Sequence, residues 1–508
     1  MTALQLILPD QGTSGAASPD TDIKRLVSWL DNLPYLAVVE SAEEMGGRLQ
    51  VLNRNKLPAS RRLKLMEHFH TAYHRLHESL IDAQLARTGR PDPHEAVQAG
   101  KILRQEMAFG YKLVVNEGLA PQYRSSGDQE IALAIERAIY YLSLYLIQHY
   151  QSYDQIDGSH WFEITVLYRY AEQQGLLEKE FSTAAQPAHA TIADTFKRIA
   201  LLRVSDPYRL PPGTVWDVFH YLGVHQQKIQ LQAPQEGAAQ AGILLLDMES
   251  NTSRESNLRD KDKYWLNGRA LIKTLSIDLE KLRDGASPKE AGFSERITGA
   301  ETIQLGTRLL NLWARTPQRV MPRFSGTGTT PLITGLNTIH HRLLDAQPNT
   351  DGQIGHIGCV RLNRSAGGLA LQCAEQDSDG LWVGQIAAVG ITDGKGIINW
   401  LPSIVRWLMR PDEDNIRFGI QYIGDKLMPV KIQTLEVNWE DRRTHAALSM
   451  ELRHSGSMLQ TILSPSGIFA KGRRIDLVHA DQLTKVRCSQ LLESLATMDR
   501  FSYSPEHT

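Results

Sequence analysis

Apolar residues recur every three or four positions through most of the chain between residues 22 and 230. This spacing runs through KRLVSWLDNL, RRLKLMEHFHTAYHRLHESLIDAQLA, EIALAIERAIYYLSLYLIQHYQ, SHWFEITVLYRYAEQQGL and ATIADTFKRIALLRV. It matches the period of an α-helix with one buried stripe. LIKTLSIDLEKLRDG, which ends at Gly285, and ETIQLGTRLLNLWAR add two more expected helices. We predict an all-α bundle or loose solenoid over residues 21–300, after a flexible tail at 1–20.

The pattern changes after Arg315 to short β-type runs separated by Gly, Asn and Asp. These runs are TPLITGLNTIHHRL, HIGCVRLN, GGLALQC, LWVGQIAAVGI, INWLPSIVRWLM, IRFGIQYI and PVKIQTLEV. Strands at this spacing predict an antiparallel barrel over residues 301–432. A β-rich extension is expected at 433–508, either as part of this barrel or as a second β module. The predicted fold class is therefore α+β with several domains.

The composition and charge of the chain argue against several classes of protein. The chain has 508 residues, of which 42% are hydrophobic, and a formal net charge of −2. Such a balanced charge argues against binding a nucleic-acid polymer through bulk electrostatics. No apolar stretch is long enough to span a bilayer, and the N-terminus lacks the basic segment of a signal peptide. The three cysteines have no metal-binding spacing and are expected to be core thiols, so we expect a cytoplasmic protein.

The segment WARTPQRVMPRF precedes the first β run and carries three arginines. Arg315, Arg319 and Arg323 are four residues apart, and Pro317 and Pro322 prevent a continuous helix between them. A guanidinium can hydrogen-bond two acceptors at once, such as guanine O6 and N7 or two phosphate oxygens, and can stack on a base. Ordinary solvated arginines at a domain boundary are the simpler interpretation of this segment alone.

The apolar run CVRLNRSAGGLALQC is interrupted by a polar and glycine-rich stretch. Asn363 supplies an amide and Ser365 a hydroxyl, and Gly367 and Gly368 allow close approach of a ligand. A polar corner between two strands would explain the stretch if it stood alone. Its combination with an arginine loop at the entrance to the same β domain favours a binding site.

This combination resembles the PilZ family, which are small β-barrel receptors for the bacterial second messenger cyclic di-GMP. The family pattern is R-x-x-x-R followed by D/N-x-S-x-x-G, and Asn363, Ser365 and Gly368 match its second half. The first half is matched by Arg315/Arg319 or by Arg319/Arg323, and we prefer the second pair because it lies closest to the first strand. LWVGQIAAVG, SIVRWLMR and IRFGIQYI look like the later PilZ strands. The resemblance covers residues 310–432, whereas the helical region resembles no named family.

The resemblance implies a cyclic di-GMP receptor that needs no cofactor. The implied ligand-binding residues are Arg315, Arg319, Arg323, Asn363, Ser365, Gly367 and Gly368. Because the arginine loop also joins the helical region to the barrel, ordering it would change the contact between the two. The implied output is a contact between the helical region and a protein partner, in motility, pili or biofilm control. A homo-oligomer is compatible with this scheme. The alternative is a degenerate PilZ scaffold that no longer binds nucleotide.

One feature departs from the family pattern. Arg323 and Asn363 are 40 positions apart, which is more than a strand and a tight hairpin require. We expect the extra residues to lie in IHHRLLDAQPNTDGQIGH, as a longer loop or a short helix before the second strand.

Two further patterns concern metal binding and catalysis. HFHTAYHRLHESL places His70, His74 and His77 on one helical face with His68 nearby, a spacing that can bind zinc. With no obvious fourth ligand, a polar helix face is the simpler interpretation. The chain contains no G-x-S-x-G, Walker or H-E-x-x-H motif. We therefore expect no catalytic residues, no resident metal and no enzymatic activity.

Overall fold

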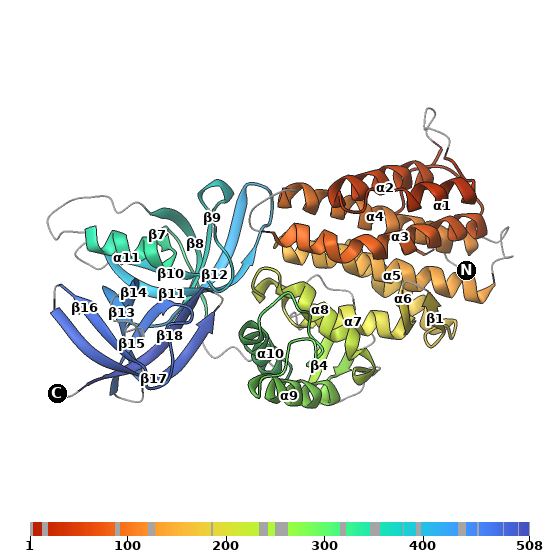
Figure 1. Cartoon of the computed structure of the whole chain (residues 1–508). Helices are drawn as coiled ribbons and strands as arrows, with labels where there is room; N and C mark the ends of the chain where they lie inside the picture. Colours follow the sequence, from red (N-terminus) through yellow and green to blue (C-terminus); the bar gives the residue numbers. More distant parts are fainter. Residues whose placement is uncertain are drawn as a thin grey trace.

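The computed structural model describes residues 4–12, 19–86, 92–119, 127–183, 186–232, 242–248, 263–314, 322–345, 356–378, 380–392, 398–434, 443–454, 457–480, 482–495 and 497–506. A helical domain is followed by two β-barrels, and the helices and barrels lie at opposite ends of an elongated molecule (Figure 1). The α+β class predicted from the sequence is confirmed.

The helical domain is a bundle of long helices. Its helices are α1 (Ile23–Asp31), α2 (Val38–Asn53), α3 (Ala59–Leu85), α4 (Pro93–Gly118), α5 (Asp128–Gln151), α6 (Ser159–Gln173), α7 (Ile192–Val204), α8 (Thr214–Val224), α9 (Arg269–Arg283) and α10 (Gly299–Ala314). Buried residues lie on every side of α5, as expected for a helix enclosed by others. One continuous apolar core extends from Leu26 in α1 to Trp313 in α10.

The helical domain also contains short strands, which the helical period did not predict. They are β1 (Glu180–Thr183) with β2 (Gln186–Thr191), and the three-stranded sheet of β3 (Gln230–Gln232), β5 (Lys263–Asn267) and β4 (Ile243–Asp247). The N-terminal segment at residues 4–12 packs along the bundle. Leu4 and Leu6 contact the helical core, and the Ile7 amide donates to Glu163 Oε1 at 2.7 Å.

The first barrel follows α10. Its strands are β6 (Phe324–Ser325), β7 (Thr329–Thr334), β8 (Ile357–Ser365), β9 (Gly368–Ala374), β10 (Ile386–Thr392), β11 (Ile398–Met409) and β12 (Asn415–Tyr422). They pair in the order β6-β8-β7-β10-β11-β12-β9, and pairing of β8 with β9 closes the sheet. The extra length expected before the second long strand contains a helix, α11 (Leu336–Asp345).

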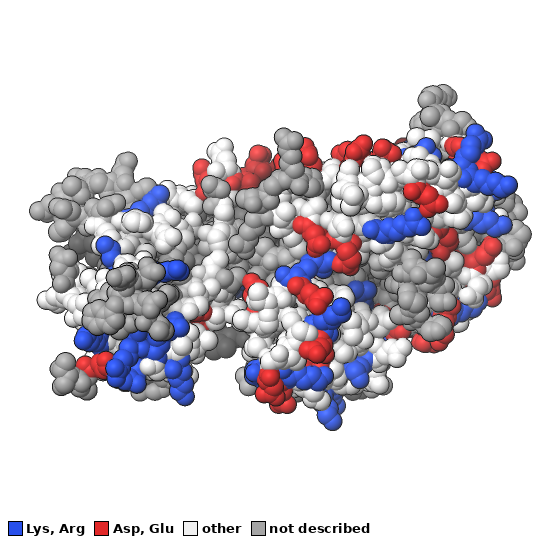
Figure 2. Space-filling view, in the orientation of Figure 1, with Lys and Arg blue, Asp and Glu red and all other residues white. Residues whose placement is uncertain are grey.

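The C-terminal residues form a second closed barrel in the order β13-β14-β15-β18-β17-β16. Its strands are β13 (Lys426–Thr434), β14 (Arg443–His454), β15 (Ser457–Pro465), β16 (Arg474–His479), β17 (Gln482–Leu495) and β18 (Met498–Pro505). The expected boundary at residue 432 falls inside β13, which pairs with β14 and β16. Figure 2 shows Lys and Arg side chains gathered on this barrel, where Lys471, Arg473, Arg474, Lys485 and Arg487 are exposed.

Helix α11 packs between the two barrels. It contacts β7 and β10 of the first barrel and β13, β14 and β15 of the second. A shared apolar cluster contains Ile339 of α11, Ile386 and Ile404 of the first barrel, and Leu448 and Leu463 of the second. This cluster therefore packs the two barrels against each other.

Among the histidines of α3, His70 is fully buried and His74 and His77 are half-buried, so the interpretation of a polar helix face is wrong for His70. His70 Nδ1 is 2.8 Å from the hydroxyl of Tyr141, and the ring of His74 stacks on that of Tyr140. His77 Nδ1 is 2.9 Å from the hydroxyl of the tyrosine one turn before it. A tyrosine hydroxyl of α5 therefore pairs with one ring nitrogen of His70, and one of α3 with one ring nitrogen of His77. Among the described residues, no group of three or more His, Cys, Asp and Glu is arranged to hold a metal ion.

No helix within the described ranges has both the length and the apolarity needed to cross a membrane.

Burial of these histidines predicts a loss of stability in mild acid. It holds the pKa of His70 and His77 well below the ordinary value and lowers that of His74 to about 4. Below pH about 6.5 the unfolded chain takes up protons that the folded protein excludes, so the free energy of unfolding falls as the pH is lowered toward 4. We expect His74→Phe, which retains the stacking on Tyr140, to reduce this fall by about 2 kcal/mol at most between pH 7.5 and 5.

The measurement is urea unfolding followed by helical circular dichroism at pH 7.5 and 5. His68→Phe, on the same helix, serves as the control. An unchanged pH dependence in His74→Phe would contradict the assignment.

Candidate ligand-binding site

The polar stretch within CVRLNRSAGGLALQC is a tight hairpin between β8 and β9. Ser365 pairs with Gly368, so Ala366 and Gly367 alone form the turn. Ser365 Oγ also donates to the carbonyl oxygen of Gly368 at 3.3 Å. Asn363 is therefore a strand residue rather than a loop residue. Its side chain and that of Ser365 are fixed by the pleat of β8, and both are half-buried.

The end of the arginine loop lies beside this hairpin. Strand β6 pairs with β8 through Phe324 with Arg364 and Ser325 with Asn363. One step further in the same antiparallel register, Arg323 stands opposite Ser365. Arg323 is exposed. Arg315 and Arg319, the other two arginines of the predicted site, lie outside the described residues.

The register also decides which side chains share a face. Leu369 and Leu371 of β9 point into the barrel core, so Gly368 and Ala370, which alternate with them, face outward. Asn363 pairs with Ala370, and Ser365 with Gly368. Because paired residues lie on the same face of a sheet, both motif side chains face outward.

Two residues of the β6 segment share that outer face. Ser325 is paired with Asn363, and Arg323 lies just before the strand. Of the three predicted arginines, Arg323 is therefore the one that the structure shows next to a strand paired with the Asn363 hairpin. Ser325 is a neighbour of the site that sequence reasoning missed, because its position depends on a two-residue strand.

Gly368 has a structural reason to be glycine besides ligand access. A Cβ at this position would overlap the carbonyl oxygen of Ile420 in β12. The carbonyl of Gly367, in the turn, accepts a hydrogen bond from the Tyr422 amide at 3.0 Å. These contacts hold the hairpin against the end of β12. Because Gly368 has no side chain, nothing projects from the outer face at this position.

The outer face continues across β12 to β11, where sequence reasoning missed further residues. Gly419 pairs with Ala370 and with Trp407, and a Cβ on Gly419 would overlap the Trp407 indole. The indole therefore lies across the outer surface of β12. Small residues form the floor between Trp407 on one side and the Asn363 hairpin on the other.

A β-bulge places two consecutive side chains on this surface. Val405 and Leu408 both point into the core, and the register shifts between Val405 and Trp407. The bulge lets Arg406 and Trp407 both leave the core. Arg406 Nε donates to Gln421 Oε1 at 2.8 Å. In the sequence, the signal for this bulge was the presence of two consecutive residues, Arg406 and Trp407, between two residues that point into the core.

Comparison with known proteins gives two matches. Residues 24–236 match the family model described as the N-terminal domain of the cyclic-di-GMP receptor FimW. The whole chain aligns with the cyclic-di-GMP receptor FimW of Pseudomonas aeruginosa at 22% identity over 583 aligned positions, covering 98% of this chain and 93% of the relative.

The chain is similar to FimW along nearly its whole length. The match of the family model begins at the first turn of α1 and ends after β3, so it lies in the helical domain. That domain resembled no named family in its sequence pattern. The PilZ-like motifs lie at residues 315–368, outside the region that the family model matches.

The FimW-like region contacts the first barrel through Tyr153, directly after α5. Tyr153 is buried among the core residues of the barrel, and its hydroxyl donates to the carbonyl oxygen of Leu210 at 2.8 Å. Its φ of 59° is a left-handed conformation that costs free energy for a non-glycine residue. Burial raises the pKa of its phenol above the ordinary value.

Arg410, at the end of β11, fixes this junction. Its amide donates to the carbonyl oxygen of Tyr153, and its own carbonyl accepts from the Gln155 amide, each at 2.7 Å. Its guanidinium donates to the Ser152 carbonyl oxygen at 2.6 Å and to Glu375 Oε1 at 2.9 Å. The junction thus lies next to the end of β9, whereas the Asn363 hairpin lies at the beginning of β9.

We predict that Tyr153→Ala destabilises the protein by about 3–5 kcal/mol, because it empties a space in the barrel core. Tyr153→Phe retains the ring and loses the bond to Leu210, which costs about 1 kcal/mol. Chemical unfolding monitored by circular dichroism measures both. Equal effects of the two substitutions would show that the buried ring does not hold the junction.

Proposed function

We propose that this protein is a cyclic di-GMP receptor of PilZ type, which binds the nucleotide on the outer face of its first barrel. The observation that supports the proposal is the pairing of β6 with β8, in which Phe324, the residue after Arg323, pairs with Arg364, and Ser325 pairs with Asn363. The similarity to the cyclic-di-GMP receptor FimW supports the same ligand.

The ligand carries two phosphates and two guanines on a compact ring. Arg319 and Arg323 bind guanine edges and phosphate oxygens, and Arg315 is the third candidate arginine. Asn363 and Ser365 donate from the barrel surface. Gly367 and Gly368 have no side chains that project from that surface, so that the ring of the ligand can lie directly over the backbone.

Trp407 and Arg406 extend the proposed site on its far side. An indole lying along the barrel offers a stacking surface for a purine. Arg406 is bonded to Gln421 and also to Glu493 of β17, with Nη1 2.6 Å from Oε1. The pKa of Arg308 in α10 is lowered to about 10, by burial first and then by the positive charge of Arg406. Arg406 therefore links the site face electrostatically to the helical domain and the second barrel.

Signal transmission follows from how the two domains are joined. The arginine loop connects α10 to β6, and the Tyr153–Arg410 junction holds the opposite end of β9. The nucleotide shifts the balance between two domain arrangements by its difference in affinity for them. The helical domain then changes its contact with a protein partner, in motility, pili or biofilm control. The protein acts in the cytoplasm as a binding protein, not as an enzyme.

Isothermal titration with cyclic di-GMP tests the receptor function. We expect saturable binding to the wild type, and losses of affinity of about tenfold to a hundredfold in Arg319→Ala, Arg323→Ala and Ser365→Ala, because each removes a bond to a charged or polar group of the ligand. Arg474→Ala, on the second barrel, is the matched control and should bind as the wild type does.

The degenerate-scaffold alternative makes the opposite prediction. A well-folded wild type that does not bind cyclic di-GMP would support the scaffold and defeat the receptor proposal. Thermal melting of the apo variants should stay close to the wild type in the receptor case, because Arg323 is exposed.

A further inference from the structure

A single carboxylate, that of Glu493 in β17, lies between two arginines where the barrels meet. Arg406 of β11 donates to both of its oxygens, with Nη1 2.6 Å from Oε1 and Nη2 3.3 Å from Oε2. Arg500 of β18 has Nη2 4.0 Å from Oε2, and its Nη1 donates to the Ile423 carbonyl oxygen at 3.2 Å. Arg500 Nε is buried and has no hydrogen-bond partner in the part of the chain that the structure describes. One negative charge is therefore shared by two positive ones.

A third arginine comes from the helical domain. Gln304 of α10 donates to Oγ of Ser494, the residue after Glu493, at 2.8 Å. Arg308 is one turn further along α10, on the same face of the helix as Gln304. Helix α10 lies on the side of the helical domain that faces the barrels (Figure 1). The face of α10 that contacts β17 therefore carries Arg308 as well.

Arg308 has no counter-ion. Within the described ranges it makes no hydrogen bond and no ion pair, although it is half-buried. Burial first, and then the positive charges of Arg406 and Arg209, lower its pKa to about 10. Asp206 acts in the opposite direction, but this carboxylate is paired with Arg209, whose Nε is 2.8 Å away. A half-buried guanidinium near other arginines and without an anion is unfavourable in the free protein. We call Arg308, Arg406 and Arg500 the arginine cluster.

The charges of the arginine cluster are not balanced. Among the described residues, Glu493 supplies the one carboxylate that lies within 4 Å of any of the three guanidinium groups. Asp499 precedes Arg500 in β18, but it accepts hydrogen bonds from the Ser494 hydroxyl at 2.6 Å and from the Gly467 amide at 2.8 Å. The cluster therefore keeps an excess of positive charge, which attracts an anion.

The arginine cluster borders the proposed nucleotide site. Gln421 of β12 pairs with Gly368 of the hairpin and accepts a hydrogen bond from Arg406 Nε at 2.8 Å. Gln421 is exposed and follows the core residue Ile420, so it lies on the outer face with Gly368. The side chains of Arg406 and Arg500 are 28% and 15% exposed, so solvent reaches both. A phosphate of a ligand that lies over Gly368 is therefore within reach of the cluster.

We propose that Arg308, Arg406 and Arg500 form a phosphate subsite, which takes one phosphate group of the cyclic dinucleotide bound on the outer face of the first barrel. Guanidinium groups suit phosphate because each offers several N–H donors in one plane. The three arginines come from the helical domain, the first barrel and the second barrel, so one phosphate bridges all three. The inference rests on the proposed function, and it adds the contact through which the nucleotide reaches α10.

The test is isothermal titration of the full-length protein with cyclic di-GMP, combined with thermal melting of the apo protein. We expect about tenfold weaker binding to Arg308→Gln, and an affinity that depends less on NaCl concentration than that of the wild type, because one charge contact is lost. Arg308→Lys keeps the charge and should recover part of the affinity. Because Arg308→Gln removes an unpaired, half-buried charge, its apo melting temperature should equal or exceed that of the wild type.

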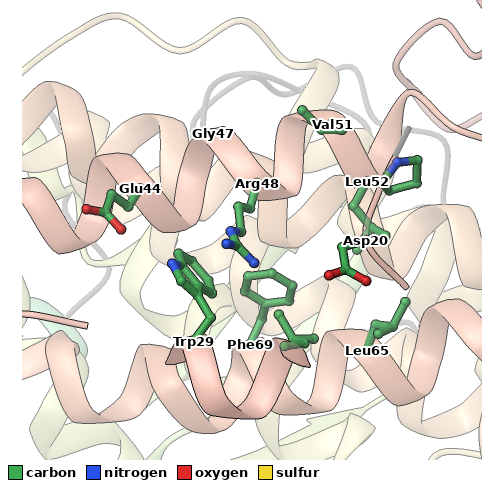
Figure 3. A pocket seen from close by; sticks show the side chains of 11 residues that line it. Asp20, Trp29, Glu44, Gly47, Arg48, Val51, Leu52, Leu65 and Phe69 are labelled. Atoms are coloured by element: carbon green, nitrogen blue, oxygen red, sulfur yellow. The ribbon is translucent and has the colours of Figure 1, made fainter. Parts of the chain in front are cut away.

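Arg48→Gln is the matched control and should bind cyclic di-GMP as the wild type does. Arg48 is an exposed arginine of α2, and its guanidinium carbon is 3.7 Å from the centroid of the Trp29 ring, away from the barrels (Figure 3). Wild-type affinity in Arg308→Gln overturns the proposal. A loss of affinity together with a fall in the apo melting temperature also overturns it, because Arg308 would then act in the packing of the domains.

Inorganic phosphate separates the subsite from the receptor function. Compared with chloride at the same ionic strength, phosphate should raise the melting temperature of the wild type more than that of Arg308→Gln. This effect in a protein that does not bind cyclic di-GMP would uphold the subsite and defeat the receptor function. Equal affinity of the wild type and Arg308→Gln for cyclic di-GMP, with no such effect of phosphate, would do the reverse.

Discussion

Two backbone pairings, Phe324 with Arg364 and Ser325 with Asn363, hold the chain that leaves the helical domain against the first barrel. They fix one end of the arginine loop at the outer face of β8, while Ala314 at the end of α10 fixes the other. The proposed site therefore depends on the position of a very short strand more than on any single side chain.

The site face and the domain junction lie at opposite ends of β9. Gly368 begins the strand beside the hairpin, and Glu375, just after its end, is bonded to Arg410 at the junction. Strand β9 is paired on both sides, with β8 and with β12. A change at the hairpin can therefore reach the junction through the position of the strand as a whole, in addition to the covalent path through the arginine loop. Tyr153 is well placed to respond, since it is inserted into the same core.

Residue patterns predicted those parts of the molecule in which a local rule decides the structure. The helical period in α3 and α5 and the alternation in the barrel strands are of this kind. The partners of a residue were not predictable where they come from distant chain segments. His70 looked like a surface residue because its partner, Tyr141, is 71 positions away. Trp407 and Gly419 became part of the candidate site only through the register of β11, β12 and β9.

The small apolar cluster around α11 has a mechanical consequence. Because Ile339 packs with residues of both barrels, a turn of one barrel relative to the other would disturb this cluster. The barrels also contact the helical domain away from Tyr153, where Gln304 Nε2 of α10 donates to Ser494 Oγ of β17 at 2.8 Å. The basic surface on β16 and β17 lies on the side of the barrels that is remote from the helices (Figures 1 and 2). A small tilt of the barrels at the Tyr153 junction would therefore displace this basic surface more than any part nearer the junction.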